Sequence, residues 1–147
     1  MSTMPQPSAR PVANILFVCI GNSCRSQMAE AMARKLGKGN VRAWSAGLYP
    51  LGWIASGTHI VMEENAFFLD GQSSKSLKDV KIEDMDIVVE MGREVTCPLP
   101  EGFKGRLVEW EIPDPYGAAL DDYRSARDMI EQHVTRLLAE IETPASP

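Results

Sequence analysis

The stretch ILFVCIGNSCRSQMAE, residues 15–30, decides how the chain begins to fold. Residues 12–20 form a continuous apolar run with β-branched side chains, which is typical of a central parallel strand buried on both faces. From Ser26 the apolar residues recur at helical spacing until Gly37, which has the position of a C-terminal helix cap. The sequence therefore predicts a strand, a short polar turn and a helix in direct succession.

The rest of the chain continues this alternation. The further predicted elements are a strand at 41–47, a helix at about 54–68, strands at 86–91 and 105–110, and an amphipathic helix at 123–141. We expect Asp121 or Asp122 to lie near the N-cap of the last helix. Strands that alternate with helices predict parallel pairing, with helices on both faces of the sheet and ligands bound beyond the carboxyl ends of the strands.

Length and charge limit the classes of function. The chain has 147 residues, a net charge of −5 and no block of Lys or Arg, so duplex nucleic acid is not an expected partner. The N-terminus has no apolar signal region, and the apolar run at 12–20 is too short to cross a membrane. We expect a disordered lead at 1–11, one domain at 12–142 and a tail at 143–147. We further expect a cytoplasmic monomer with reduced thiols.

The turn after the first strand has the composition of an anion-binding loop. Its backbone N–H groups can converge on one point, and the following helix adds its N-terminal dipole. Gly21 and Asn22 tolerate the positive φ that such a curl requires, and Arg25 offers a planar cationic fork to two oxygens of a tetrahedral anion. The residues expected to bind this oxyanion are Ile20, Gly21, Asn22, Ser23, Cys24 and Arg25.

Cys19 stands at the end of the strand, below the expected anion. A helix N-terminus and a guanidinium favour the thiolate form of a cysteine, and Ser26 can add a hydroxyl hydrogen bond. We therefore expect Cys19 to attack the central atom of the anion. Asp114, in the segment IPDPYG, is the expected acid that protonates the leaving group and then activates water.

Other kinds of site fit the residues poorly. The spacing of a nucleotide-binding P-loop and its lysine are absent. The three cysteines include no Cys-x2-Cys pair, and His59 and His133 lie in helical segments, so we expect no metal.

Four segments together carry a family resemblance. FVCIGNSCRSQMAE, SAG at 45–47, SSKSL at 73–77 and DPYG at 114–117 resemble the low-molecular-weight protein tyrosine phosphatase superfamily, which includes the thioredoxin-coupled arsenate reductases. The resemblance implies a three-layer α/β sandwich with a four-stranded parallel sheet, of the flavodoxin-like or phosphotyrosine phosphatase I-like kind. It also implies the roles given above to Cys19, Arg25 and Asp114, with Asn22 and Ser26 supporting the loop and the thiolate.

The chain resembles both branches of this superfamily. Gln27, the Cys97–Pro98 step and the segment 122–138 are similar to the reductases. In the segment VVEMGREV, however, Gly92 stands close to the point where the reductases have a resolving cysteine. The aromatic residue in DPYG is closer to the phosphatases.

The missing thiol decides our main expectation. Arsenate reduction consumes two electrons and needs a second thiol to displace arsenite from the nucleophile. Cys97, Cys24 or an external thiol such as thioredoxin or glutaredoxin would have to supply it, whereas hydrolysis needs no cofactor. We therefore expect a phosphatase, with arsenate reductase and a non-catalytic binder of oxyanions or phosphopeptides as the alternatives.

Two further expectations concern the surroundings of the loop. Tyr49, Trp53 and Tyr116 are candidates for the wall that flanks a substrate, either a phosphotyrosine-containing protein or a small oxyanion. Trp44 and Trp110 are expected in the core. The spacing of Cys24 from Cys19 also suggests a reversible disulfide that protects the nucleophile from overoxidation.

Overall fold

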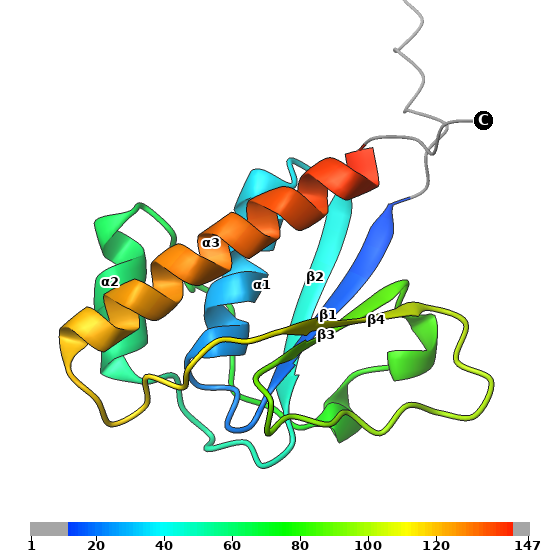
Figure 1. Cartoon of the computed structure of the whole chain (residues 1–147), viewed down its shortest axis with the longest axis horizontal. Helices are drawn as coiled ribbons and strands as arrows, with labels where there is room; N and C mark the ends of the chain where they lie inside the picture. The colour runs from blue at the N-terminus through cyan, green and yellow to red at the C-terminus, as the bar shows by residue number, and fades with distance from the viewer. Residues whose placement is uncertain (1–11, 143–147) are drawn as a thin grey trace, which may run out of the picture.

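The computed structural model describes residues 12–142, so the predicted lead at 1–11 and tail at 143–147 lie outside the described residues. A single parallel sheet forms the centre of the fold (Figure 1). Its strands are β1 (Ala13–Cys19), β2 (Val41–Gly47), β3 (Ile87–Met91) and β4 (Arg106–Trp110), in the spatial order β2-β1-β3-β4. The predicted fold class, a four-stranded parallel sheet with flanking helices, is confirmed.

Helices cover the sheet unequally. The three α-helices are α1 (Arg25–Leu36), α2 (Ser56–Glu64) and α3 (Leu120–Glu142), and two short 3-10 helices are η1 (Leu77–Asp79) and η2 (Ile82–Asp84). In Figure 1 the α-helices lie together on one side of the sheet, while the two 3-10 helices lie on the other. None of the helices within 12–142 has the length and apolarity that crossing a membrane requires.

The side chains of β1 divide the core into two clusters. Ile15, Phe17 and Cys19 belong to the larger cluster, which includes residues of all three α-helices. Leu16 and Val18 belong to the smaller cluster on the opposite face, because successive side chains of a strand point to opposite faces. Burial of β1 on both faces is what its continuous apolar sequence predicts.

Two helix boundaries differ from the prediction. The helix predicted at about 54–68 extends only over Ser56–Glu64, because Ala55 before it has an extended backbone and Ala66 after it has a left-handed one, with φ 62°. The last helix, predicted from 123, begins at Leu120, so Asp121 and Asp122 lie near its N-cap as predicted, inside its first turn. The Asp122 carboxylate there accepts a hydrogen bond from the backbone N–H of Ala119.

Parallel pairing places the carboxyl ends of the strands at one edge of the sheet. Cys19 ends β1, Met91 ends β3 and Trp110 ends β4. The segment that carries Asp114 follows β4 directly, so it lies at the same edge as the turn between β1 and α1.

Candidate active site

The turn between β1 and α1 curls with its carbonyl groups facing outward. The carbonyl oxygens of residues 19, 20, 21 and 23 accept hydrogen bonds, in that order, from the backbone N–H groups of Leu48, Tyr49, Leu51 and Ala55. In a trans peptide unit the N–H group points opposite to the carbonyl. The N–H groups that follow these carbonyls therefore turn toward the concave side of the loop, which is the arrangement of an anion-binding nest.

A left-handed residue and a glycine allow this curl. Asn22 has φ 48°, and its side-chain N–H donates to Ser26 Oγ at 2.8 Å. Gly47, the last residue of β2, packs directly beneath the loop. A Cβ atom at Gly47 would lie 2.7 Å from the carbonyl oxygen of Ile20 and 2.9 Å from the backbone nitrogen of Asn22. Only glycine leaves room for the loop at that point.

Cys19 lies at the bottom of the loop with 2% of its surface exposed. Its Sγ is 2.9 Å from Ser26 Oγ and accepts a hydrogen bond from the backbone N–H of Asn22 at 3.2 Å. Cys19 also directly precedes the loop that leads into the N-terminus of α1. Donors and a helix dipole of this kind stabilise a negatively charged sulfur.

Arg25 is buried, with 1% of its surface exposed, and one end of its guanidinium is anchored. Nη1 donates to the carbonyl oxygens of Met91 at 2.6 Å and Ile112 at 3.0 Å, and to Glu94 Oε1 at 2.6 Å. Nη2 lies 3.6 Å from Asp114 Oδ2. Nε is buried and has no hydrogen-bond partner within residues 12–142. A buried N–H without a partner is costly, and an oxyanion in the loop would satisfy it.

Glu94 is the acidic partner of this arginine, and sequence reasoning missed it. Although burial opposes the shift, the hydrogen bond from Arg25 lowers the pKa of the Glu94 carboxyl below its ordinary value. Glu94 is separated from Arg25 by 69 positions in the chain, so no local pattern indicates the pair. A glutamate shortly after the end of a strand was the only signal in the sequence.

Gly92 makes the Arg25–Glu94 pair sterically possible. Its φ is 140°, a backbone conformation that side chains disfavour. A Cβ atom at this position would collide with Arg25 Nη1 and Glu94 Oε1. The position near which the resemblance to the reductases implies a resolving cysteine is therefore closed to any side chain while the ion pair is present.

A cavity of about 210 Å³ opens above the loop. Cys19, Arg25 and Asp114 line it together with Tyr49 and Tyr116. The Asp114 side chain is partly exposed, and its Oδ1 accepts the backbone N–H of Tyr116 at 3.1 Å. The structure thus brings the predicted nucleophile, arginine and acid to one cavity.

The aromatic side chains predicted at the substrate wall divide into two groups. Tyr49 and Tyr116 line the cavity, whereas Trp53 is not among its lining residues and has 55% of its surface exposed.

Of the two tryptophans expected in the core, Trp110 is buried, packs on Phe17 and stacks on His133 at a centroid distance of 4.9 Å. Trp44 is half-buried against the smaller core cluster.

The two other cysteines have surroundings that disfavour the thiolate. Burial raises the pKa of the Cys24 thiol to about 11, against hydrogen bonds with the hydroxyls of Thr58 and Tyr123. Burial and the nearby Glu90 carboxylate raise the pKa of the Cys97 thiol to about 11. Cys97 belongs to the smaller core cluster, on the opposite face of the sheet from Cys19. All three cysteines are free thiols.

Metal chemistry has no evident site in the described part of the chain. Residues 12–142 contain no group of three or more His, Cys, Asp or Glu side chains arranged to hold a metal ion.

Comparisons with known proteins identify similar chains of two named activities. A family model described as low molecular weight phosphotyrosine protein phosphatase matches residues 14–146. The glutaredoxin arsenate reductase of Synechocystis sp. is 35% identical over 133 residues, which cover 86% of this chain and 97% of the relative. The low molecular weight protein-tyrosine-phosphatase YfkJ of Bacillus subtilis is 29% identical over 153 residues, covering 88% and 96%. A solved structure of an arsenate reductase in the phosphate binding state is 33% identical with a TM-score of 0.81, covering 89% of this chain and 100% of that one.

Proposed function

Because this chain belongs to the low molecular weight phosphotyrosine protein phosphatase family, we propose that it is a cysteine-dependent phosphatase that hydrolyses phosphate monoesters. The family includes relatives named for phosphatase and for arsenate reductase activity, so the choice between them rests on this chain's own residues. The assignment of each site residue to a step is likewise part of the proposal.

In the first step the phosphoryl group is transferred to sulfur. The phosphate oxygens bind to the inward N–H groups of the loop and to the edge of Arg25 that carries Nε, and these groups stabilise the charge that develops in the transition state. The Cys19 thiolate attacks phosphorus, an S–P bond forms and the P–O bond to the leaving group breaks. As the general acid of this step, Asp114 gives a proton to the departing oxygen.

In the second step water regenerates the enzyme. The Asp114 carboxylate takes a proton from a water molecule as its oxygen attacks phosphorus, and the S–P bond breaks. Inorganic phosphate leaves, Cys19 returns to the thiolate and Asp114 is again protonated. The place of Asp114 in the lining of the cavity with Cys19 and Arg25 supports this role, because it sets the carboxyl group next to the bound phosphoryl group.

The observation that carries the choice of hydrolysis is the closed position at Gly92. A resolving cysteine there would collide with Arg25 and Glu94, so the chain uses that space to hold the arginine. Cys97 and Cys24 are weak substitutes, because burial raises the pKa of both thiols to about 11 and so disfavours the attacking thiolate. Hydrolysis requires none of these thiols.

For the substrate we propose an aryl phosphate, such as phosphotyrosine in a protein. Tyr49 and Tyr116 both line the cavity above Cys19, and their rings are suited to flank an aromatic leaving group. Trp53 follows Tyr49 closely in the chain and is exposed, so a larger protein substrate can contact it outside the cavity. We expect the enzyme to act as a cytoplasmic monomer.

Arsenate reduction is the second candidate, favoured by the 35% identity to an arsenate reductase and by Gln27. In this reaction Cys19 would bind arsenate with loss of water. A second thiol would then attack the Cys19 sulfur, form a disulfide and release arsenite, so that two thiols are oxidised as arsenic(V) becomes arsenic(III). With Gly92 in place, that second thiol would come from an external donor such as glutaredoxin or thioredoxin.

Parallel assays separate the candidates. Hydrolysis of para-nitrophenyl phosphate is measured beside arsenate reduction with glutaredoxin or thioredoxin as the thiol donor, in the wild type, Cys19→Ser and Cys97→Ser. We expect hydrolysis that Cys19→Ser abolishes and Cys97→Ser leaves unchanged. Efficient reduction with negligible hydrolysis would favour the second candidate. Binding of phosphate with neither activity would favour the non-catalytic alternative.

A further inference from the structure

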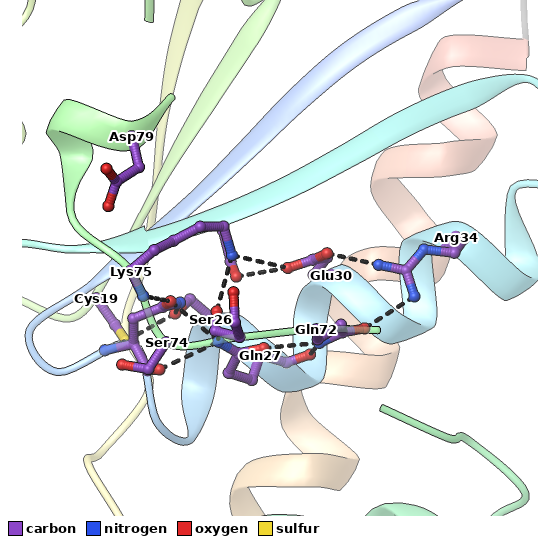
Figure 2. A network of polar contacts seen from close by, with 12 residues as sticks. Cys19, Ser26, Gln27, Glu30, Arg34, Gln72, Ser74, Lys75 and Asp79 are labelled. Atoms are coloured by element: carbon purple, nitrogen blue, oxygen red, sulfur yellow. Dashed lines mark hydrogen bonds and ion pairs between the residues drawn. The ribbon is translucent and has the colours of Figure 1, made fainter. Parts of the chain in front are cut away.

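A row of hydrogen bonds begins at the exposed end of α1 and runs inward. Arg34 Nη1 donates to Gln72 Oε1 at 2.9 Å. Gln72 Nε2 then donates to Gln27 Oε1 at 2.7 Å and to the Gln27 backbone oxygen at 3.1 Å. Arg34 and Gln27 belong to α1, whereas Gln72 belongs to the connection between α2 and η1, and Figure 2 shows the three side chains in sequence.

The same row continues to the proposed nucleophile. Gln27 Nε2 donates to Asn22 Oδ1 at 3.0 Å. Asn22 Nδ2 donates to Ser26 Oγ at 2.8 Å, and Ser26 Oγ lies 2.9 Å from Cys19 Sγ. Five hydrogen bonds therefore connect the Arg34 guanidinium to the Cys19 sulfur through four side chains.

The charged end and three backbone groups give this row of hydrogen bonds a single direction. A guanidinium has donors only, so the oxygen of the Gln72 amide must face Arg34 and its nitrogen must face Gln27. The Gln27 amide has its oxygen toward Gln72 and its nitrogen toward Asn22, and this nitrogen also donates to the backbone oxygens of Asn22 at 3.1 Å and Ser73 at 2.9 Å, which fix the amide in the same sense. The backbone N–H of Lys75 also donates to Asn22 Oδ1, at 2.8 Å, which fixes the Asn22 amide in the same sense.

The direction of these hydrogen bonds determines whether the Ser26 hydroxyl can donate to the Cys19 sulfur. Ser26 Oγ accepts the hydrogen bond from Asn22, which leaves the hydroxyl proton of Ser26 available to donate to Cys19. A donated hydrogen bond favours the charged form of an acceptor. If the Asn22 amide were reversed, its oxygen would face Ser26 and draw the hydroxyl proton away from Cys19.

Because the inner residues of the row are buried, reversing one of their amides would be costly. Gln27, Asn22 and Ser26 are all completely buried, so water cannot replace a lost partner in the inner part of the row. A reversed amide would place two donors or two acceptors face to face in a medium of low dielectric constant. At the outer end, Arg34 is held by an ion pair with Glu30, whose other oxygen accepts the Ser45 hydroxyl at 2.6 Å.

From these contacts we propose that Arg34, Gln72 and Gln27 are positioning residues that orient the Ser26 hydroxyl toward Cys19 and so stabilise its thiolate. The inference rests on the proposed role of Cys19 as nucleophile. It adds three side chains that do not line the cavity above Cys19.

The test measures the thiolate directly. The ultraviolet absorbance of the thiolate, taken as the difference from the matching Cys19→Ser protein, and the rate of Cys19 alkylation by iodoacetamide at neutral pH are recorded for Gln27→Met, Arg34→Met and Arg34→Lys. Gln132→Met, on the exposed face of α3, is the matched control for a glutamine substitution. Mass spectrometry assigns the alkylated cysteine, and circular dichroism with thermal melting establishes that each variant is folded.

We expect Gln27→Met to slow alkylation by about threefold to tenfold, the size of one lost hydrogen bond, and to reduce the thiolate absorbance. Arg34→Met should act in the same direction with a smaller effect of about twofold, because water can solvate the outer end of the row. Arg34→Lys should retain most of the wild-type rate, since lysine also has donors only. Gln132→Met should match the wild type.

Arg34 lies partly exposed on the surface, so Arg34→Met tests the row even where Gln27→Met fails to fold. Unchanged alkylation and absorbance in folded Arg34→Met and Gln27→Met, beside a reactive wild type, would overturn the inference alone. A wild-type Cys19 that reacts as an ordinary cysteine and is not protected by inorganic phosphate would instead overturn the proposed function. A loss in Arg34→Met that Arg34→Lys does not restore would also count against a directed row.

Discussion

The carboxylate of Glu94 lies 2.6 Å from the buried guanidinium of Arg25, on the end that the backbone carbonyls of Met91 and Ile112 also hold. One end of the arginine is thus fixed, and its Nε, which has no partner among residues 12–142, belongs to the other edge. The pair has two opposing effects on an oxyanion, because Glu94 orients the fork but also places a negative charge beside the site.

Glu94→Gln should separate these two effects. Glutamine keeps an oxygen that accepts from Arg25 but removes the charge, and the carbonyls of Met91 and Ile112 remain. Inorganic phosphate should therefore inhibit the variant at a concentration lower by about threefold to tenfold, with a gain that shrinks in high salt. Inhibition constants for phosphate at low and high ionic strength measure this, with Glu101→Gln, on an exposed loop, as the matched control. Weaker inhibition in Glu94→Gln than in the control would show that orientation outweighs charge.

Gly92→Cys tests whether the site tolerates the thiol that arsenate reduction would use. The new Cβ atom collides with Arg25 Nη1 and Glu94 Oε1, and the φ of 140° is unfavourable for any side chain. We expect hydrolysis to fall by at least about tenfold, the effect of displacing a transition-state donor, without a gain in arsenate reduction. Gly92→Ala serves as the control, because it adds the Cβ atom alone and should lose as much activity. Undiminished hydrolysis in Gly92→Ala would contradict the steric account.

The part of the site around Cys19 could be predicted from sequence because its residues are close together in the chain. Cys19, the loop and Arg25 lie within seven consecutive residues, and the apolar strand before them and the helical spacing after them place the turn at a sheet edge. Asp114 could be brought to the same edge because the segment after a parallel strand has only one edge to occupy.

The remaining features depend on contacts that no spacing encodes. Glu94 reaches Arg25 across 69 positions, and Gln72 reaches Gln27 across 45. The face of the sheet to which Cys97 belongs depends on the path of the loop after β3. The helix α2 ends early because Ala66 adopts a left-handed backbone, which an alanine in a helical pattern does not indicate.

The three thiols should differ in reactivity at neutral pH. Burial raises the pKa values of Cys24 and Cys97 to about 11, so both remain protonated thiols. Cys19 faces the backbone N–H of Asn22, the Ser26 hydroxyl and a helix N-terminus, so iodoacetamide should modify Cys19 first, and phosphate should slow that reaction. Peptide mapping after short exposure gives the order. Faster modification of Cys24 or Cys97 than of Cys19 would contradict the proposed nucleophile.

Mild oxidation tests the disulfide suggested between Cys19 and Cys24. Both residues line the cavity above the loop, so we expect brief peroxide treatment to join them and a thiol reductant to restore activity. Mass spectrometry of the peptide that spans both cysteines identifies the product. Cys24→Ser, the control, should lose activity irreversibly under the same treatment. Sulfinic acid at Cys19 without any disulfide in the wild type would argue against this protection.

Acid stability should depend on the ion pairs that join α2 to α3. The Glu64 carboxylate accepts hydrogen bonds from Arg124 and Arg127, and the bonds from Arg124 chiefly lower the pKa of Glu64 to about 2 from an ordinary 4.5. Because the folded-state pKa is depressed, the stabilisation is fully present above pH 4.5 and is lost as the pH falls toward 2. We expect the free energy of unfolding of Glu64→Gln to be lower than that of the wild type at neutral pH and to approach it near pH 2. Urea unfolding at several pH values measures this, and the exposed Glu63→Gln, one residue away, is the control. A constant difference between Glu64→Gln and the wild type across that range would exclude titration of Glu64 as the cause.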